Sequence, residues 1–271
     1  MGSSTGKVAF ITGVARGQGR AHALRLAAEG ISIIGIDVCE DTTAADYPVA
    51  TEADLAETVR LVEQAGGTIL ATKADVRDFS QQKAAFDAGF QEFGRIDIVI
   101  ANAGIIRLAD EIDPVAEFDD IIATNLSGAW KTVRVALPAM IEAGNGGSIV
   151  LVSSAAGIKG GGSPLAGMQA YTAAKRGLVG LMQVLANDLA EHWIRVNTIH
   201  PTGVATPMVL NEAMRRAVER RRDGVATMRN ALPIGLLDVD DVANTVAWLV
   251  SDEARSITGV ALPIDAGFTV R

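Results

Sequence analysis

The stretch Lys7-Val-Ala-Phe-Ile-Thr-Gly13-Val-Ala-Arg-Gly17-Gln-Gly19 decides the fold. Its first half is a short apolar run with β-branched residues, typical of a buried strand, and its second half is a glycine-rich turn. An apolar-periodic stretch at 21–28 follows and predicts a helix. Three close glycines let the backbone approach a diphosphate, whose charge would lie against the free N–H groups of the helix start. We therefore predict a phosphate-binding turn between a strand and a helix; the alternative is an ordinary tight connection.

A second apolar run, residues 31–36, predicts the next strand and ends in Asp37, 20 residues after Gly17. In a dinucleotide-binding fold this position holds the acid that binds the adenosine ribose hydroxyls. A carboxylate there would repel the 2′-phosphate of NADP, and residues 38–41 include no cation. Arg16 is the counter-evidence, because it can reach such a phosphate, the diphosphate or another element. We rank Asp37 above Arg16 and predict NAD as the cofactor.

The rest of the chain continues the alternation of strands and helices. We expect helices at 52–64, 80–93, 117–142, 169–192 and 238–250, and strands at 68–74, 96–101, 148–152, 195–199 and 260–264. Such alternation predicts an α/β fold, a doubly wound, mostly parallel sheet of the Rossmann type. The length of 271 residues suits a single domain at 7–271, and the polar residues 1–6 are expected to be a disordered leader.

Composition excludes several classes of function. A net charge of −8 argues against a nucleic-acid-binding surface, and the basic run at 215–222 is interleaved with acids, which favours a solvated helix face. One cysteine excludes an internal disulfide, and no apolar stretch reaches the roughly 20 residues of a membrane helix. We therefore expect a cytoplasmic protein with no membrane partner. The three histidines are scattered, so no metal site is predicted.

Tyr171-Thr-Ala-Ala-Lys175 places a phenol and an ammonium on the same face of a helix. A tyrosine that acts as a base near neutral pH needs a pKa about 3 units below its usual value of about 10, and a neighbouring cation can supply much of that shift. The pair is a candidate proton-transfer device. The alternative is a packed ring beneath a solvated lysine.

Six motifs in order resemble the short-chain dehydrogenase/reductase family. They are Thr12-Gly13-x-x-x-Gly17-x-Gly19, Asn102-Ala-Gly104, Asn125, Ser154, Tyr171-x-x-x-Lys175 and Pro201-x-Gly203-x-x-Thr206-Pro-Met208. The chain looks most similar to the carveol-dehydrogenase-like, mycofactocin-associated branch. The signs are Arg16-Gly-Gln-Gly-Arg20, the insertion after Asp37 with Tyr47-Pro48, residues 54–62 and the ending at 262–270.

The resemblance implies a catalytic tetrad. Tyr171 would exchange a proton with the substrate oxygen, Ser154 would hydrogen-bond that oxygen, Lys175 would favour the phenolate and hold the cofactor ribose, and Asn125 would anchor a water. The residues implied to bind NAD are Gly13, Arg16, Gly17, Gln18, Gly19, Asp37, Val38, Cys39, Asp75, Val76, Asn102, Ala103, Gly104, Tyr171, Lys175, Pro201, Gly203, Val204, Thr206 and Met208. A substrate lid is expected at about 205–231.

Two catalytic assignments have alternatives. Sixteen residues separate Ser154 from Tyr171, more than is usual in the family, and Gly160-Gly-Gly162 predicts that the extra length is a loop. Ser153 is the alternative to Ser154, and Asn125 can simply mark a kink in an apolar helix.

The segments expected to line the substrate pocket contribute Ile, Leu and Met, which favours an apolar secondary alcohol, such as a cyclic terpene alcohol, or its ketone. A 3-oxoacyl-thioester reductase and a non-catalytic NAD-binding regulator are the alternatives. The resemblance also implies a homotetramer. We further expect the insertion at about 40–51 to cover the adenosine end of the cofactor and slow its release, and the resemblance implies that the retained NADH passes its hydride to a redox acceptor.

Overall fold

The computed structural model describes residues 6–42, 45–108, 113–220 and 229–271. Residues 1–5 of the expected leader, 43–44 of the insertion and 221–228 of the expected lid lie outside the described residues. Gly6 already belongs to the folded domain, because its N–H donates to the Gly30 carbonyl at 3.3 Å.

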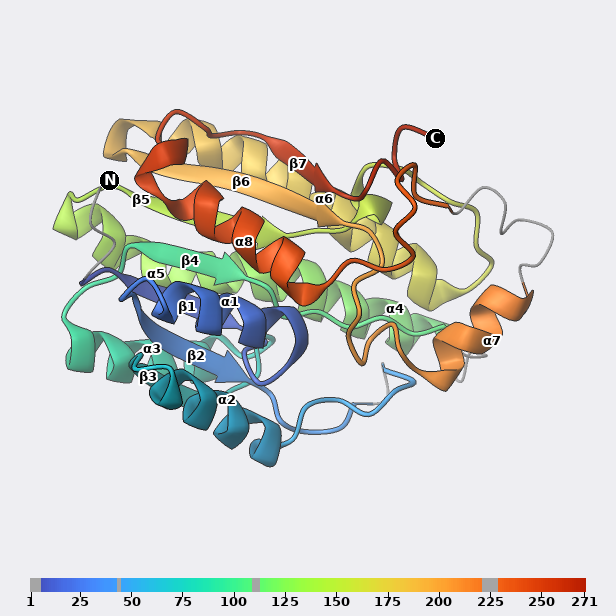
Figure 1. Ribbon diagram of the computed structural model, residues 1–271, viewed down its shortest axis with the longest axis horizontal. Coiled ribbons are helices and arrows are strands. Elements are labelled where there is room, and N and C mark those ends of the chain that lie inside the picture. The colour runs from blue at the N-terminus through green and yellow to red at the C-terminus, as the bar shows by residue number, and fades with distance from the viewer. Residues whose placement is uncertain (1–5, 43–44, 109–112, 221–228) are drawn as a thin grey trace.

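One parallel sheet forms the centre of the molecule (Figure 1). Its seven strands, in spatial order, are β3 (Ile69–Lys73), β2 (Ser32–Asp37), β1 (Val8–Thr12), β4 (Ile98–Ala101), β5 (Gly147–Val152), β6 (Ile194–Pro201) and β7 (Ala261–Ile264). Every pairing is parallel. The predicted doubly wound α/β fold in a single sheet is confirmed.

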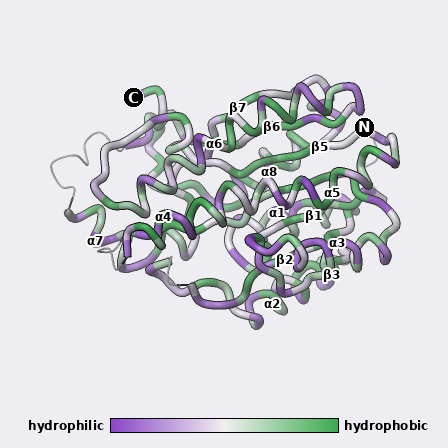
Figure 2. The backbone as a smooth tube through the Cα atoms, turned by 180° about the vertical axis from the view of Figure 1, so that it is seen from behind, coloured by the Kyte–Doolittle hydropathy of each residue, from purple (hydrophilic) through white to green (hydrophobic). Residues whose placement is uncertain are grey.

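Helices cover both faces of the sheet. One apolar core joins the sheet to α1 (Gly17–Ala27), α2 (Glu52–Gln64) and α8 (Val239–Val250). The other joins it to α3 (Phe79–Phe93), α5 (Ala129–Ala143) and α6 (Ala166–Asp188). Because both faces are covered, the central strands are largely apolar, as in Ile98–Ala101 of β4 and the last four residues of β5. Figure 2 shows much hydrophobic colour along the sheet in the middle of the molecule.

Side-chain caps explain where several helices begin. Thr51 and Asp54 form a reciprocal capping box at α2, and Asp238 and Asp241 form another at α8. Asp113 accepts from two backbone N–H groups at the start of α4 (Pro114–Ile122), whose first residue is a proline. These caps fix the loops from which the site is built.

The single helix expected at 117–142 is wrong in detail. The chain forms α4, then a π-helical turn at Ala123–Gly128, then α5. The extra residue of the wider turn lets the Asn125 side chain bond the backbone of Ile105, and Gly128 passes close to Val76, where a Cβ would lie 2.8 Å from a methyl carbon. The kink that the sequence offered as an alternative for Asn125 is therefore a π turn.

Candidate active site

The glycine turn, Asp37, Asn102 and Ser154 lie at the carboxyl ends of β1, β2, β4 and β5. The strand order reverses between β1 and β4 (Figure 1). Asn102, after β4, ties the two strand ends together. Its side-chain amide donates to the carbonyls of Thr12 at 2.9 Å and Gly13 at 3.2 Å, and its backbone N–H donates to the Thr12 hydroxyl at 3.1 Å. Asn102 thus positions the glycine turn.

The glycine turn is a cradle that side chains would fill. Gly13 and Gly17 have positive φ values of 70° and 55°, and a Cβ on Gly19 would lie 1.9 Å from the Gly13 carbonyl oxygen. Helix α1 begins at Gly17 without a side-chain cap, so its first N–H groups are left to a ligand. The cradle fits the diphosphate of a dinucleotide.

Asp37 ends β2 beside this cradle, and only 9% of its surface is exposed. One carboxylate oxygen accepts the Ala15 N–H at 2.9 Å. Burial raises the pKa of Asp37, while backbone hydrogen bonds from Ala15, Cys39 and Val38 and the charge of Arg16 act in the opposite direction. The carboxylate is therefore fixed at the strand end that the sequence predicted.

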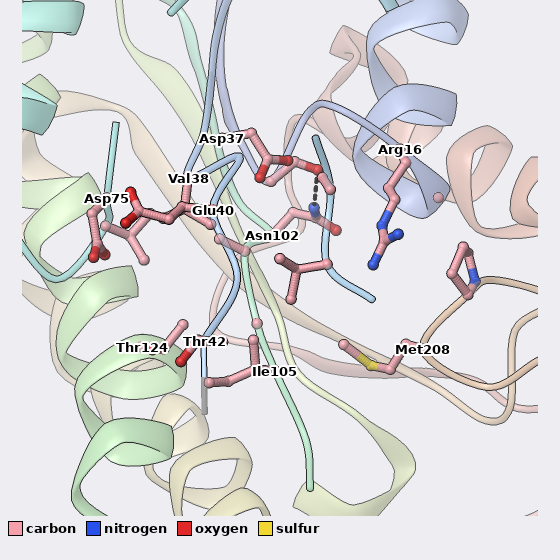
Figure 3. Close-up of a pocket in the computed structure, with 18 of the residues that line it drawn as sticks. Arg16, Asp37, Val38, Glu40, Thr42, Asp75, Asn102, Ile105, Thr124 and Met208 are labelled. Carbon is pink, nitrogen blue, oxygen red and sulfur yellow. Dashed lines mark hydrogen bonds between the residues drawn. The ribbon is translucent and has the colours of Figure 1, made fainter. Parts of the chain in front are cut away.

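A cavity extends from Asp37 across the strand ends. Figure 3 shows Asp37, Glu40 and Asp75 at one end, and Arg16 and Met208 at the other. The predicted cofactor residues in its wall are Gly13, Arg16, Gly17, Gln18, Asp37, Val38, Asp75, Val76, Asn102, Ala103, Gly104, Thr206 and Met208. Asp75 also pairs with Arg77 at 2.7 Å.

The other predicted cofactor residues lie behind or beside this wall. Gly19 supports the turn, Cys39 is buried in the core behind Asp37, and Pro201 pairs with Ile264 in the sheet. Gly203 and Val204 hold Leu237 through a short parallel bridge. Tyr171 and Lys175 stand deeper, beyond Gly104. The binding roles of these residues stay predictions.

The insertion after β2 spans the cavity. Arg16 donates to the Pro48 carbonyl at one side, and the Asp46 carboxylate accepts the Leu108 N–H at 2.7 Å at the other. The sequence left Arg16 with a 2′-phosphate, the diphosphate or another element as its partner, and in the structure its side chain contacts the insertion at Pro48. The insertion therefore connects the glycine turn to the segment after β4, beyond the adenosine end where it was expected.

Tyr171, Lys175 and Ser154 meet beyond the cavity wall. The Lys175 Nζ lies 5.6 Å from the centroid of the Tyr171 ring, and Ser154 hydrogen-bonds the Tyr171 hydroxyl. Ser153 is buried, and its hydroxyl donates to the Lys175 carbonyl at 2.7 Å. The serine that faces the phenol is Ser154, and residues 160–162 form the exposed loop that the longer spacing predicts.

The ionisation of this pair differs from the expectation that the cation lowers the tyrosine pKa. Burial raises the pKa of Tyr171, and only the Ser154 hydrogen bond opposes it. Lys175 lies over the Tyr171 ring and donates to the Val152 carbonyl at 2.8 Å. Burial lowers the pKa of Lys175 itself to about 8.

Asn125 reaches the same place from the π turn. Its side chain accepts the Ile105 N–H and donates to the Ile105 carbonyl, each at 2.8 Å. A Cβ on Gly104 would lie 3.2 Å from the Asn125 carbonyl oxygen and 3.3 Å from the Lys175 Nζ. The structure thus brings all four residues of the predicted tetrad into one region.

Two residues near the tetrad carry no role in the sequence analysis. His200 is buried; its ring nitrogens lie 2.8 Å from the Ser154 carbonyl and 2.8 Å from the Thr198 hydroxyl. Tyr47, from the insertion, packs beside Tyr171. The position of His200 at the end of the predicted strand before Pro201 was its only signal, and no spacing linked Tyr47 to Tyr171.

Among the residues that the structure describes, 6–42, 45–108, 113–220 and 229–271, no group of three or more His, Cys, Asp or Glu is placed to bind a metal ion. Within the same ranges, no helix has both the length and the apolar character needed to cross a membrane.

Known proteins resemble this chain over its whole length. It is 54% identical to an oxidoreductase of Mycobacterium tuberculosis, over 97% of this chain and 96% of that protein. It is 45% identical to a (-)-trans-carveol dehydrogenase of Rhodococcus erythropolis, over 98% of each chain. The crystal structure of a carveol dehydrogenase from Mycobacterium avium in complex with NAD matches with a TM-score of 0.92 at 43% identity, over 100% of both chains.

A sequence profile described as Enoyl-(Acyl carrier protein) reductase, from the short-chain dehydrogenase/reductase family, matches residues 13–269. The match covers the glycine turn, the acid after β2 and the Tyr171 and Lys175 pair. With the cradle, the parallel sheet and relatives that bind NAD, it shows that this chain is an NAD-dependent oxidoreductase that belongs to the short-chain dehydrogenase/reductase family.

Proposed function

We propose that the enzyme interconverts an apolar secondary alcohol, such as a cyclic terpene alcohol, and its ketone, with Tyr171 as the acid and base. The observation that carries this proposal is the position of Tyr171 between a polar and an apolar environment. Ser154 and Lys175 lie on one side of it, and Ile106, Leu108, Met168 and Met208 belong to the apolar cluster on the other.

In this mechanism the chain moves a proton while bound NAD supplies the hydride acceptor. Tyr171 takes the hydroxyl proton of the alcohol, and Ser154 holds the substrate oxygen by a hydrogen bond. Lys175 lies close enough to swing from the Val152 carbonyl toward the phenol, where its charge would favour the phenolate. Asn125 fixes Ile105 and anchors the water that continues the proton relay. Asp37 and the glycine turn hold the cofactor.

The charges around the apolar cluster support an uncharged substrate. Arg107 forms a buried ion pair with Glu117 at 3.0 Å, and Arg215 on α7 (Glu212–Arg220) pairs with Glu212 at 2.5 Å and Glu219 at 2.6 Å. A reductase of 3-oxoacyl thioesters would use a basic entry patch, and these described cations are already paired. The (-)-trans-carveol dehydrogenase among the relatives favours the alcohol.

The proposal also includes retained NAD. The insertion is held at two nearby residues, by the Arg16 side chain at Pro48 and by the Leu108 N–H at Asp46, and these contacts keep it against the cavity that we assign to the cofactor. The resemblance to the mycofactocin-associated branch implies the same behaviour. NADH would then stay bound and pass its hydride to a separate redox acceptor.

The experiment is to purify the protein without added cofactor and to assay bound nucleotide by mass spectrometry. Carveol is then offered with an artificial electron acceptor in place of free NAD. We expect copurified NAD and oxidation that depends on the acceptor. Empty protein that turns over exchangeable NAD would contradict retention, and no oxidation of carveol or simpler cyclic alcohols under either condition would contradict the alcohol substrate.

A cytoplasmic homotetramer completes the proposal. Leu178 and Leu185 of α6, and Leu189 directly after it, are buried within the chain. Other large apolar side chains remain outside, including Phe118 on α4, Trp130 on α5 and Val184 on α6. These helices are the surfaces that we assign to the subunit contacts, and light scattering of the purified protein would measure the assembly.

A further inference from the structure

The insertion reaches the catalytic tyrosine as well as the cofactor cavity. Tyr47 lies between Asp46, which accepts the Leu108 N–H, and Pro48, whose carbonyl accepts from Arg16. Both neighbours of Tyr47 along the chain are therefore held, one by Arg16 before α1 and the other by Leu108 after β4. This places the Tyr47 side chain in a fixed position although it belongs to an irregular segment.

Tyr47 is buried, with 8% of its surface exposed, and has a backbone hydrogen bond with Ile106. It belongs to a group that we call the Tyr171 cluster. The members come from the insertion, the segment after β4, the start of α6, and the segment from β6 into α7: Ala45, Tyr47, Ile106, Leu108, Met168, Tyr171, Met208, Met214 and Ala217. These four segments are far apart in the sequence and come together only when the chain folds.

Tyr47 and Met208 belong both to this cluster and to the wall of the cofactor cavity. They therefore connect the cofactor cavity with the apolar side chains around Tyr171, the residue to which we assign the proton transfer. Among the described members of this cluster, Tyr47 and Tyr171 are the two aromatic residues. A ring next to the proton-transfer group offers a flat, rigid apolar surface to a cyclic substrate.

We propose that Tyr47 is a specificity-determining residue whose ring forms one wall of the substrate chamber beside Tyr171. The insertion would thus hold the cofactor and shape the substrate site with one segment. This inference rests on the proposed alcohol dehydrogenase function. It adds that the insertion determines which alcohols the enzyme prefers, an effect that retention of the cofactor does not explain.

The test compares Tyr47→Ala, Tyr47→Leu and Tyr47→Phe with wild type on cyclohexanol and 4-tert-butylcyclohexanol. Removing the ring opens space beside Tyr171, so Tyr47→Ala should raise the kcat/KM of the bulky alcohol relative to cyclohexanol about tenfold or more. The change should lie mainly in KM. Tyr47→Phe keeps the ring and should stay within about twofold of the wild-type ratio. Tyr47→Leu also removes the ring but fills more of the space than alanine does, so it replaces Tyr47→Ala in the test if the alanine variant fails to fold.

Val49→Ala is the matched control, because Val49 is a buried residue of the same insertion that lines the cofactor cavity outside the Tyr171 cluster. It should alter NAD retention and leave the ratio between the two alcohols unchanged. Calorimetry with cyclohexanone and 4-tert-butylcyclohexanone on the NAD-loaded variants gives a second readout that does not need turnover. In Tyr47→Ala and Tyr47→Leu, which lack the ring, the ratio of the two dissociation constants should shift in favour of the bulky ketone. It should stay unchanged in Tyr47→Phe and Val49→Ala.

The outcomes separate the two proposals. An unchanged ratio in Tyr47→Ala and Tyr47→Leu, with an active wild type, overturns the role of Tyr47 and leaves the alcohol dehydrogenase intact. A shifted ketone ratio without turnover of either alcohol by wild type supports Tyr47 and overturns the proposed reaction. A wild-type protein that binds neither ketone and oxidises neither alcohol overturns both.

Discussion

Replacing Lys175 with methionine should make the cofactor-free protein more stable while removing its activity. The Lys175 ammonium is 4% exposed, and burial lowers its pKa from 10.5 to about 8. At about 1.4 kcal/mol for each pKa unit, keeping this charge in the fold costs about 3 kcal/mol at neutral pH. Methionine has a similar length and carries no charge.

The loss of one hydrogen bond offsets part of this gain. Lys175 Nζ donates to the Val152 carbonyl at 2.8 Å, and an unsatisfied buried carbonyl costs about 1 to 2 kcal/mol. The net gain for Lys175→Met is then about 1 to 2 kcal/mol, which raises the Tm of a domain of this size by about 2 to 8 °C. Turnover and NAD affinity should both fall, because Lys175 is assigned to both.

The gain should also depend on pH in a defined direction. The pKa of Lys175 is lower in the folded chain than in the unfolded chain, so the folded state binds fewer protons between about pH 8 and 10.5. The cost of the charge is complete below about pH 8 and disappears as the pH rises toward 10.5. The advantage of Lys175→Met over wild type should shrink across this window.

Thermal unfolding followed by circular dichroism at pH 7 and pH 10 measures this difference. Nucleotide is removed first and its absence is checked by mass spectrometry, because bound NAD would stabilise the wild type. Lys83→Met is the control, since Lys83 is an exposed helical lysine paired with Asp87 at 2.5 Å and should show no comparable gain. A variant of Lys175 that is less stable than wild type at pH 7, or a gain that does not change with pH, would refute this reasoning.

Two further predictions concern the cofactor. Asp37→Ser should lower the preference for NAD and admit NADP, because we assign to the carboxylate both the ribose contacts and the repulsion of a 2′-phosphate. Calorimetry with both cofactors measures this preference. Wild type that binds NADP as tightly as NAD would contradict the role of Asp37. Arg16→Ala and Asp46→Ala should each speed the release of NAD, because each removes one attachment of the insertion, whereas Arg25→Ala in the helix that follows Arg16 should not. Release is measured by chasing labelled NAD with unlabelled NAD, and equal rates in all four proteins would exclude the insertion as a clamp.

The regular part of the fold could be predicted because its signals are local. Both faces of the sheet are covered, so β1 and β2 are apolar runs, and the glycine turn and Asp37 follow directly after these runs. Strand ends in a parallel sheet meet at one edge, which is why Asn102, Ser154 and Asp37 could be expected near one another.

The features that escaped prediction depend on contacts between distant residues. The π turn in the expected helix at 117–142 exists where Asn125 bonds Ile105, which lies 20 residues earlier. The insertion has no periodicity, and its course depends on contacts with Arg16 and Leu108 from two other loops. The pKa of Tyr171 followed burial instead of the nearby cation, because the spacing of Tyr171 and Lys175 says nothing of where the ammonium points.

The central claim is that Tyr171 carries the proton transfer of an NAD-dependent alcohol oxidation, and Tyr171→Phe tests it most directly. Phenylalanine keeps the ring in the Tyr171 cluster and removes only the hydroxyl that bonds Ser154. The rate at which carveol reduces the bound NAD, followed by NADH absorbance in a single turnover, should fall roughly 100-fold or more, while calorimetry shows NAD binding within about twofold of wild type. A variant that reduces NAD within a few-fold of the wild-type rate would contradict the claim.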